Sequence, residues 1–307
     1  MSESAPRLNT SVLLLIFNRP TLTFATFERI RAARPERLFI AGDGPRGDRP
    51  EDATAVEQAR TLTGMVDWDC EVKTLYRDHN LGCARAVSSA IDWAFESVDE
   101  LIILEDDCLA ASSFFPFCTE LLERFRDDQR VFVISGDNFQ QGPPRAPYSY
   151  YFSRYNHCWG WATWKRAWRH FDLEMRLWPE IRDGNWLVDV LQDSLATTYW
   201  KRIFGQVHAG KIDTWDYQWT FACWMQGGLT VLPAVNLVQN VGFGENATHT
   251  KKESCHGPPA ENLIFPLSHP SYVLRDDHAD AWTQIHHFGF GTVGLWDRIR
   301  YFLRSRL

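Results

Sequence analysis

Three consecutive carboxylates, Glu105, Asp106 and Asp107, follow the apolar run at residues 101–104. Neighbouring carboxylates repel one another and raise each other's pKa unless a cation lies among them. Divalent cations such as Mn2+ and Mg2+ prefer oxygen ligands, so the cluster predicts a metal and phosphate site. The alternative is an acidic loop that caps a helix beginning near Ser112, although Asp106 and Asp107 lie far before that residue.

Tryptophans are concentrated in one part of the chain, because ten of the fourteen lie between Trp159 and Trp224. Most of these rings are expected in the core, where large aromatic side chains contribute strongly to burial. An aromatic plane can also stack on the apolar face of a sugar ring. The segment HCWGWATWKRAW is the best candidate for such a site, with Trp159 and Trp161 on either side of Gly160.

The elements that must position these residues alternate along the first half of the chain. Apolar runs predict five strands, and segments with helical spacing of apolar residues separate them. The predicted strands are 11–17, 37–41, 72–75, 101–104 and 131–135. This rhythm predicts βαβ units and a mainly parallel sheet flanked by helices, which is an α/β fold. Open sheets of this class bind ligands at the carboxyl ends of their strands, where Glu105 to Asp107 lie.

Charge and composition exclude some classes of protein. The net charge of -7 and the pI near 5.8 argue against a nucleic-acid partner, which would need a basic face. Seven cysteines without a CxxC pair predict reduced thiols, and the start of the chain lacks a signal-peptide pattern. We therefore expect a cytoplasmic protein. The segment from Gly294 predicts an amphipathic, basic C-terminal helix, for which peripheral contact with the inner membrane is the alternative to docking on the protein.

The ordered motifs FNRP, HNLGCARAV and EDDCLAASSFF resemble the GT-A glycosyltransferases, which use nucleotide-diphosphate sugars. EDD followed by a Phe-Phe helix is similar to the N-acetylglucosaminyltransferase I type. The Trp-rich segment resembles bacterial glycosyltransferases described as hemolysin-like. The resemblance implies a GT-A, Rossmann-like fold with a nucleotide-sugar half at 11–140, an acceptor and catalytic-base half at 141–270, and an extension at 271–307.

Carried onto matching positions, the resemblance implies that Phe17, Asn18 and Arg19 lie against the nucleoside. It also implies that Asp43 in AGDGP accepts a hydrogen bond from the base, for which N3–H of uracil is a suitable donor. The alternative for Asp43 is a plain turn residue. Arg85 resembles a basic residue that faces the nucleotide, and the alternative is a solvent-facing charge on a helix.

The same resemblance assigns the carboxylate cluster. Asp106 resembles the contact to the ribose or sugar of the donor, Glu105 is expected to bind the donor as well, and Asp107 resembles the direct ligand of Mn2+ or Mg2+. A divalent ion would stabilise the charge of the departing nucleotide diphosphate. The Gly-rich segment at 240–250 predicts a loop that closes over the donor, with His249 as a further metal or phosphate ligand. The alternative for His249 is an exposed loop residue.

An inverting transferase also needs a carboxylate that removes the proton of the acceptor hydroxyl. Asp216 in DTWDYQW resembles this base, as part of a Trp-Asp pair that places Trp215 beside the acceptor. Asp213 is the competing candidate. The alternative is that both acids cap a helix beginning near Tyr217.

The sequence therefore predicts a metal-dependent glycosyltransferase of bacterial polysaccharide biosynthesis. It would move a sugar from a nucleotide-diphosphate sugar, a UDP-sugar above others, to a hydroxyl of a glycan or glycolipid, with inversion. One rival is a sugar nucleotidyltransferase, which should carry a Gly-rich, basic phosphate loop after its first strand; FNRPTLTF lacks one. The other rival is a carbohydrate-binding protein without turnover.

Overall fold

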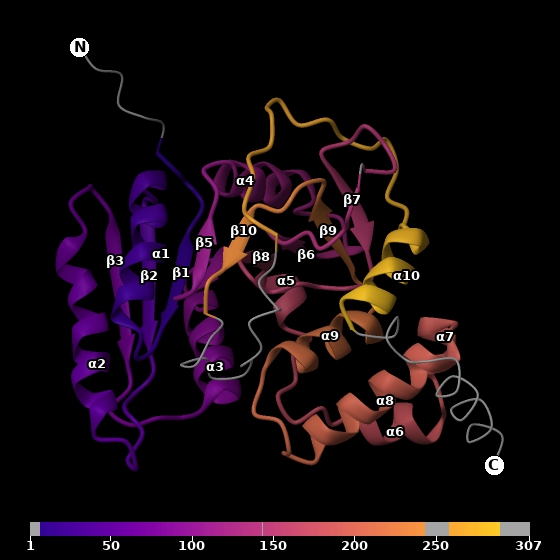
Figure 1. The fold of residues 1–307 in the computed structure, drawn as a ribbon, viewed down its shortest axis with the longest axis horizontal. Coiled ribbons are helices and arrows are strands. Elements are labelled where there is room, and N and C mark those ends of the chain that lie inside the picture. The colour runs from indigo at the N-terminus through magenta and orange to yellow at the C-terminus, as the bar shows by residue number, and fades with distance from the viewer. Residues whose placement is uncertain (1–6, 143, 243–257, 289–307) are drawn as a thin grey trace.

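A central sheet of eight strands forms the frame of the protein (Figure 1). The computed structural model describes residues 7–142, 144–242 and 258–288. The strand order is β3-β2-β1-β4-β8-β6-β9-β7, and β5 and β10 form a separate pair. The strands are β1 (Val12–Ile16), β2 (Arg37–Gly42), β3 (Glu71–Tyr76), β4 (Glu100–Glu105), β5 (Cys108–Ala110), β6 (Val131–Ser135), β7 (Tyr150–Ser153), β8 (Trp161–Trp164), β9 (Leu229–Pro233) and β10 (Val238–Asn240).

The first half of the sheet is parallel, as the sequence predicts. Strand β1 pairs with β2 on one side and with β4 on the other, and every residue of β1 is buried. Short helical connections return the chain to the same end of the sheet each time, and this produces parallel neighbours. The five predicted strands correspond to β1, β2, β3, β4 and β6. The predicted α/β fold, a mainly parallel sheet flanked by helices, is confirmed.

The second half of the sheet contains two reversed strands. Strand β8 is antiparallel to both β4 and β6, so β6 runs in the same direction as β4. Strand β9 is parallel to β6, and the edge strand β7 is antiparallel to β9. Six strands therefore share one direction, and their carboxyl ends lie along one edge of the sheet.

Helices cover both faces of the sheet. Alternate residues of β1 point to opposite faces, so Leu14 packs into one core cluster and Leu13 into the other. The Leu14 face is covered by α1 (Pro20–Ala33), α2 (Glu51–Arg60), the 3-10 helix η1 (Thr61–Met65) and α4 (Phe114–Arg124). The Leu13 face is covered by α3 (Cys83–Phe95), α5 (Lys165–Trp168), α6 (Trp178–Asp183), α7 (Leu187–Leu191), α8 (Ser194–His208) and α9 (Asp216–Met225).

The last described helix, α10 (Asp277–His286), lies beside β7, in yellow in Figure 1. The carboxylate of Asp276 accepts hydrogen bonds from the backbone N–H groups of His278 and Ala279, so Asp276 is the N-cap of this helix. The C-terminal helix predicted from Gly294 lies outside the described residues.

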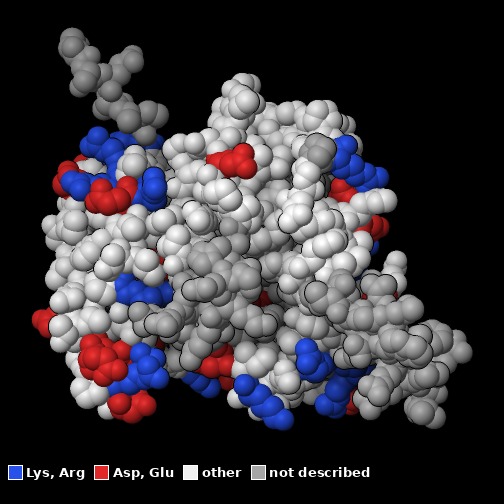
Figure 2. Space-filling view, in the orientation of Figure 1, with Lys and Arg blue, Asp and Glu red and all other residues white. Residues whose placement is uncertain are grey.

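The visible surface carries acidic and basic side chains close to one another rather than in one broad field (Figure 2). Among the described residues, no helix combines the length and the apolar character needed to cross a membrane.

Candidate functional site

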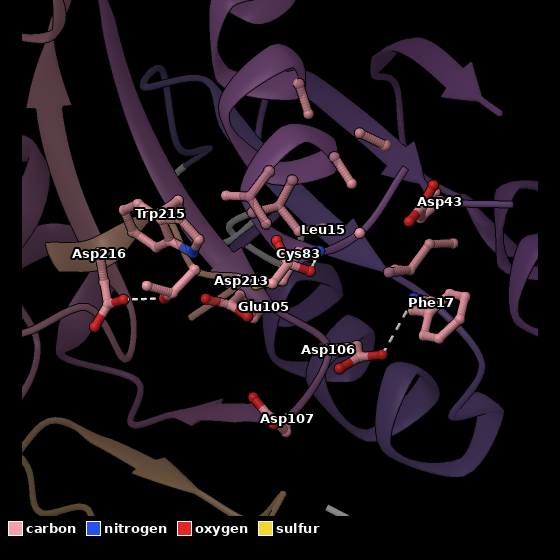
Figure 3. A pocket seen from close by; sticks show the side chains of 18 of the residues that line it. Leu15, Phe17, Asp43, Cys83, Glu105, Asp106, Asp107, Asp213, Trp215 and Asp216 are labelled. Carbon is pink, nitrogen blue, oxygen red and sulfur yellow. Dashed lines mark hydrogen bonds between the residues drawn. The ribbon is translucent and has the colours of Figure 1, made fainter. Parts of the chain in front are cut away.

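A cavity of about 680 Å³ lies where the carboxyl ends of β1, β2 and β4 meet the start of α3 and the segment before α9. Figure 3 shows Phe17 and Asp43 on one side of it, Trp215 and Asp216 on the opposite side, and Glu105 between them. Parallel strands bring their loops to one edge, and the structure thus joins residues as distant in the sequence as Leu15 and Gly242.

The predicted carboxylate cluster lines this cavity. Glu105 is the last residue of β4, and Cys108 begins β5 only three positions later. Strand β5 separates the cluster from α4, whose N-cap residue is Ser113. The alternative in which Glu105, Asp106 and Asp107 cap this helix is therefore wrong.

Arg19 neutralises part of the cluster. Its guanidinium donates to the Asp106 carboxylate and lies 2.8 Å from Oδ2 of Asp107. The backbone N–H of Phe17 also donates to Asp106, at 3.3 Å (Figure 3). Burial raises the pKa of Asp106 to about 6 against the opposing charge of Arg19. Burial, with the charges of Asp107 and Asp106, raises the pKa of Glu105 to about 8.

The same carboxylates are the candidates for a metal. Within the described ranges, no three His, Cys, Asp or Glu side chains converge on one point. A divalent ion that accompanies a nucleotide diphosphate usually takes one or two carboxylates from the protein, while phosphates and water supply the other ligands. Asp107 and Glu105 both face the cavity and offer this donor chemistry. They fit a metal that is bound jointly with a diphosphate, and Arg19 would compete with that metal for Asp107.

Asp107 is closely covered by the chain beyond β10. Asn240 donates to its carboxylate at 3.3 Å, and a Cβ atom at Gly242 would lie only 1.9 Å from Oδ2. Any larger residue at 242 would therefore have to displace the Asp107 carboxylate. The predicted ligand His249 lies outside the described residues.

Asp43 lines the cavity but is engaged with its own chain. Its carboxylate accepts hydrogen bonds from the N–H groups of Gly44 and Leu81 and from the side chain of Asn80, at 2.8 to 3.1 Å. Burial raises its pKa, and these backbone donors oppose the shift. This pattern matches the alternative in which Asp43 shapes a turn; its contact with a base stays a prediction.

Two arginines that the sequence analysis did not select also line the cavity. Arg46 lies over the ring of Phe17, 5.3 Å from the centroid, and both Nε and Nη2 donate to Asp52. Asn18 donates to Asp52 as well, at 2.6 Å, and does not line the cavity. Hydrogen bonding to Arg46 lowers the pKa of Asp52 to about 2.

The second of these arginines is Arg77, which follows β3 and donates to Ser89 on α3 at 3.1 Å. Arg85, which the sequence analysis selected, is two-thirds exposed, pairs with Glu174 and is absent from the cavity wall. Arg77 lies just before the motif HNLGCARAV, and Arg85 lies within it. The directions of β3 and α3 decide which of the two arginines faces the cavity. The position of Arg77 directly after a strand was the available signal.

The two candidate bases differ in their contacts. Each carboxylate oxygen of Asp213 accepts a backbone N–H of α3, from Cys83 at 2.9 Å and from Ala84 at 3.0 Å. Asp216 is the first residue of α9 and accepts a hydrogen bond from the Thr214 hydroxyl. Asp213 thus caps α3, not α9, so the alternative in which both acids cap the helix near Tyr217 is wrong for Asp213.

The three selected tryptophans separate into wall and core. Trp159 and Trp215 line the cavity. Trp161 is 1% exposed and lies behind Trp215, with the two rings stacked 5.3 Å apart. The structure therefore places Trp161 in the core, where it supports Trp215, rather than in the cavity wall.

The chain is distantly similar to several solved structures. The sequence matches no protein-family model and no curated protein. Similar solved structures include GalNAc-T7 with UDP, GalNAc and Mn2+, at 10% identity and a TM-score of 0.45, covering 74% of this chain and 43% of that one. The chain thus spans less than half of that structure.

Two further structures cover about half of this chain. One is a 4-diphosphocytidyl-2C-methyl-D-erythritol synthase from Anaerococcus prevotii DSM 20548, at 7% identity, a TM-score of 0.30 and coverage of 52% and 72%. The other is HddC from Yersinia pseudotuberculosis, at 10% identity, a TM-score of 0.31 and coverage of 51% and 77%. All three TM-scores lie below 0.5, so the function of this chain has to be inferred from its own residues.

Proposed function

We propose that this chain is a glycosyltransferase that moves a sugar from a nucleotide-diphosphate sugar to a hydroxyl of a glycan or glycolipid acceptor. The observation that carries the proposal is one cavity with two chemically distinct walls. Arg19, Arg46 and Arg77 line it together with the carboxylates at the end of β4. Asp216 lies on the side opposite Phe17 and Asp43 (Figure 3).

The wall formed by β1, β2 and β3 suits the nucleotide. The ring of Phe17 offers an apolar plane for a base, and Arg46 above it is held in place by its two hydrogen bonds to Asp52. Guanidinium groups bind phosphate oxygens well because they present several N–H donors in one plane. A UDP-sugar is our proposed donor, with the uracil near Asp43 and Phe17.

The wall formed by the 212–216 segment suits the acceptor. Asp216 would accept the proton of the acceptor hydroxyl as that oxygen attacks the anomeric carbon and the bond to the diphosphate breaks. Attack from the side opposite the diphosphate inverts the anomeric centre. Trp159 and Trp215 would contact the acceptor sugar through their ring faces.

Asp107, with Glu105 beside it, would hold a Mn2+ or Mg2+ ion, which supplies positive charge for the departing diphosphate when it is bound. Arg19 would then keep its contact with Asp106 and give up Asp107. Asp106 would then lie next to Arg19 and Asp107 next to the metal ion. Each buried carboxylate would keep a positive charge beside it, because an unpaired buried charge costs much free energy.

The link between β1 and α1 disfavours the nucleotidyltransferase alternative. Strand β1 ends at Ile16 and α1 begins at Pro20, so only three residues connect them. A loop that wraps a triphosphate with successive backbone N–H groups needs more residues than this.

The test combines binding and turnover. UDP should raise the melting temperature in a Mn2+-dependent way, because a ligand that binds only the folded state stabilises it. Asp216→Asn should keep this shift and lose sugar transfer by about 10²–10⁴-fold, the usual contribution of a general base. Asp107→Ala should lose the Mn2+ dependence itself. Transfer retained in Asp216→Asn would remove this residue as the base, and binding without turnover in the wild type would favour a carbohydrate-binding protein.

A further inference from the structure

We propose that Asp213 is a positioning residue, which fixes the base-bearing segment to the nucleotide half of the cavity. The proposal rests on the function proposed above. Asp213 lies three residues before Asp216 and accepts two backbone N–H groups from a helix that is about 130 positions earlier in the sequence.

The start of α3 needs an acceptor from elsewhere. The first N–H groups of a helix have no partner within it, and a side chain at the N-cap usually satisfies one of them. The N-cap of α3 is Gly82, which has no side chain and has φ of +80°. Asp213 takes over the capping role, and its charge also suits the positive end of the helix.

Asp213 lies so close to the start of α3 that it restricts which residue can occupy position 82. A Cβ atom at position 82 would lie 2.7 Å from Oδ2 of Asp213. Glycine at 82 therefore permits both the backbone conformation and the approach of the carboxylate.

Two more contacts hold the segment beyond Asp213. The ring of Trp215 stacks on that of Trp161 in the core. The hydroxyl of Thr214 donates to the carboxylate of Asp216, which orients it. Of these contacts, the one made by Asp213 joins the segment to an element of the nucleotide half, so it sets the distance between the base and the donor.

The contacts of Asp213 are those of a helix cap. Each of its oxygens accepts a backbone N–H from a helix distant in the sequence, whereas Asp216 accepts from the hydroxyl of Thr214, two residues before it. This contrast predicts different behaviour of the two asparagine variants. Asparagine is a good capping residue because its amide oxygen accepts a backbone N–H, but it cannot accept a proton from a hydroxyl.

The experiment compares Asp213→Ala, Asp213→Asn and a matched control, Asp193→Ala. Asp193 caps α8 through the N–H of Ala196 at 2.7 Å and does not line the cavity. We expect kcat for sugar transfer to fall about 100-fold in Asp213→Ala, since a displacement of about 1 Å can have this effect. Asp213→Asn should recover part of the activity that Asp213→Ala loses, because its amide oxygen can still accept one of the two backbone N–H groups. Asp193→Ala should lose stability but not kcat. The dissociation constant of UDP with Mn2+ should change much less than kcat in Asp213→Ala and should stay close to the wild-type value in the other two variants.

Amide hydrogen exchange provides a readout without turnover. Peptides that cover 80–86 and 212–217 should both exchange faster in Asp213→Ala and remain unchanged in Asp193→Ala. Unchanged exchange, or an unchanged kcat in Asp213→Ala, would overturn the proposal. Equal loss of kcat in Asp213→Asn and Asp213→Ala would identify Asp213 as a base instead. A wild type that transfers no sugar would refute the proposed function, while the exchange data would still decide whether Asp213 anchors the segment.

Discussion

Arg19 is the residue on which the charge balance of the cavity depends, because it pairs with two buried carboxylates. Removing one partner of a buried ion pair leaves an uncompensated charge, which costs about 3 kcal/mol of stability. We expect Arg19→Ala to be destabilised by this amount and to be stabilised by Mn2+ more than the wild type is. Chemical unfolding with and without the ion measures both effects. The control is Arg85→Ala, whose exposed ion pair should contribute less than about 1 kcal/mol; equal losses in both variants would contradict the prediction.

A second prediction at the residue scale concerns Asp52 and the pH dependence of the free energy of unfolding. Its folded pKa of about 2 lies below the ordinary value of 3.8, so the stabilising effect is present above about pH 4 and is lost as the pH falls toward 2. Hydrogen bonds to charged groups are worth about 2 kcal/mol. Asp52→Asn should therefore be less stable than the wild type by this amount at pH 6, and the difference should shrink at pH 2–3. A difference that is constant across this range would show that Asp52 does not act through its charge.

At the scale of elements, the two tryptophans that flank Gly160 should respond differently to substitution. Trp161 begins β8 and is fully buried, so Trp161→Phe should cost about 1–3 kcal/mol of unfolding free energy because it leaves a cavity. Trp159 lines the cavity, so Trp159→Phe should mainly raise KM for the acceptor. Urea unfolding and acceptor titration separate the two effects. A raised acceptor KM in Trp161→Phe at unchanged stability would return that residue to the site.

The first-half elements could be predicted because their signals are local. A buried parallel strand such as β1 is apolar throughout, and the helices between the strands show apolar stripes. The second half gives weaker signals, since β7 and β8 have four residues each and are rich in aromatic side chains that suit either a strand or a helix. Asp276 shows the same ambiguity, because an acidic residue can begin a helix as well as a turn.

At the scale of the whole molecule, α10 is attached to the second half of the sheet by a buried ion pair. Asp280 is 1% exposed, accepts from the Ser153 hydroxyl at 2.5 Å and lies 3.1 Å from Nε of Arg154. Asp280→Ala should therefore lower the unfolding free energy by about 3 kcal/mol, since Arg154 would lose the buried one of its two carboxylate partners. Asp277→Ala is the control, because Asp277 is exposed and should contribute less than about 1 kcal/mol. Similar losses would mean that burial of Asp280 does not matter.

Residues of the candidate cavity could be predicted where a local sequence motif marks them. Glu105 to Asp107 follow one strand, and their shared position at its end is visible in the sequence. Arg46, Arg77 and the capping role of Asp213 depend on which loops meet at the sheet edge, and no local pattern encodes that meeting. For the same reason the sequence did not show that Arg77, rather than Arg85, lines the cavity.

The reversed direction of β8 has a consequence for where new specificity can arise. Strands β4 and β6 present the residues that follow them to the cavity edge, whereas β8, which lies between them, presents the residues that precede it. Trp159 lies before β8 and therefore lines the cavity. Its backbone N–H donates to the carboxylate of Asp137, which follows β6, at 3.1 Å. In the glycosyltransferase that we propose, insertions just upstream of residue 159 would therefore change the acceptor side of the cavity and leave the side lined by Phe17 and Asp43 unchanged.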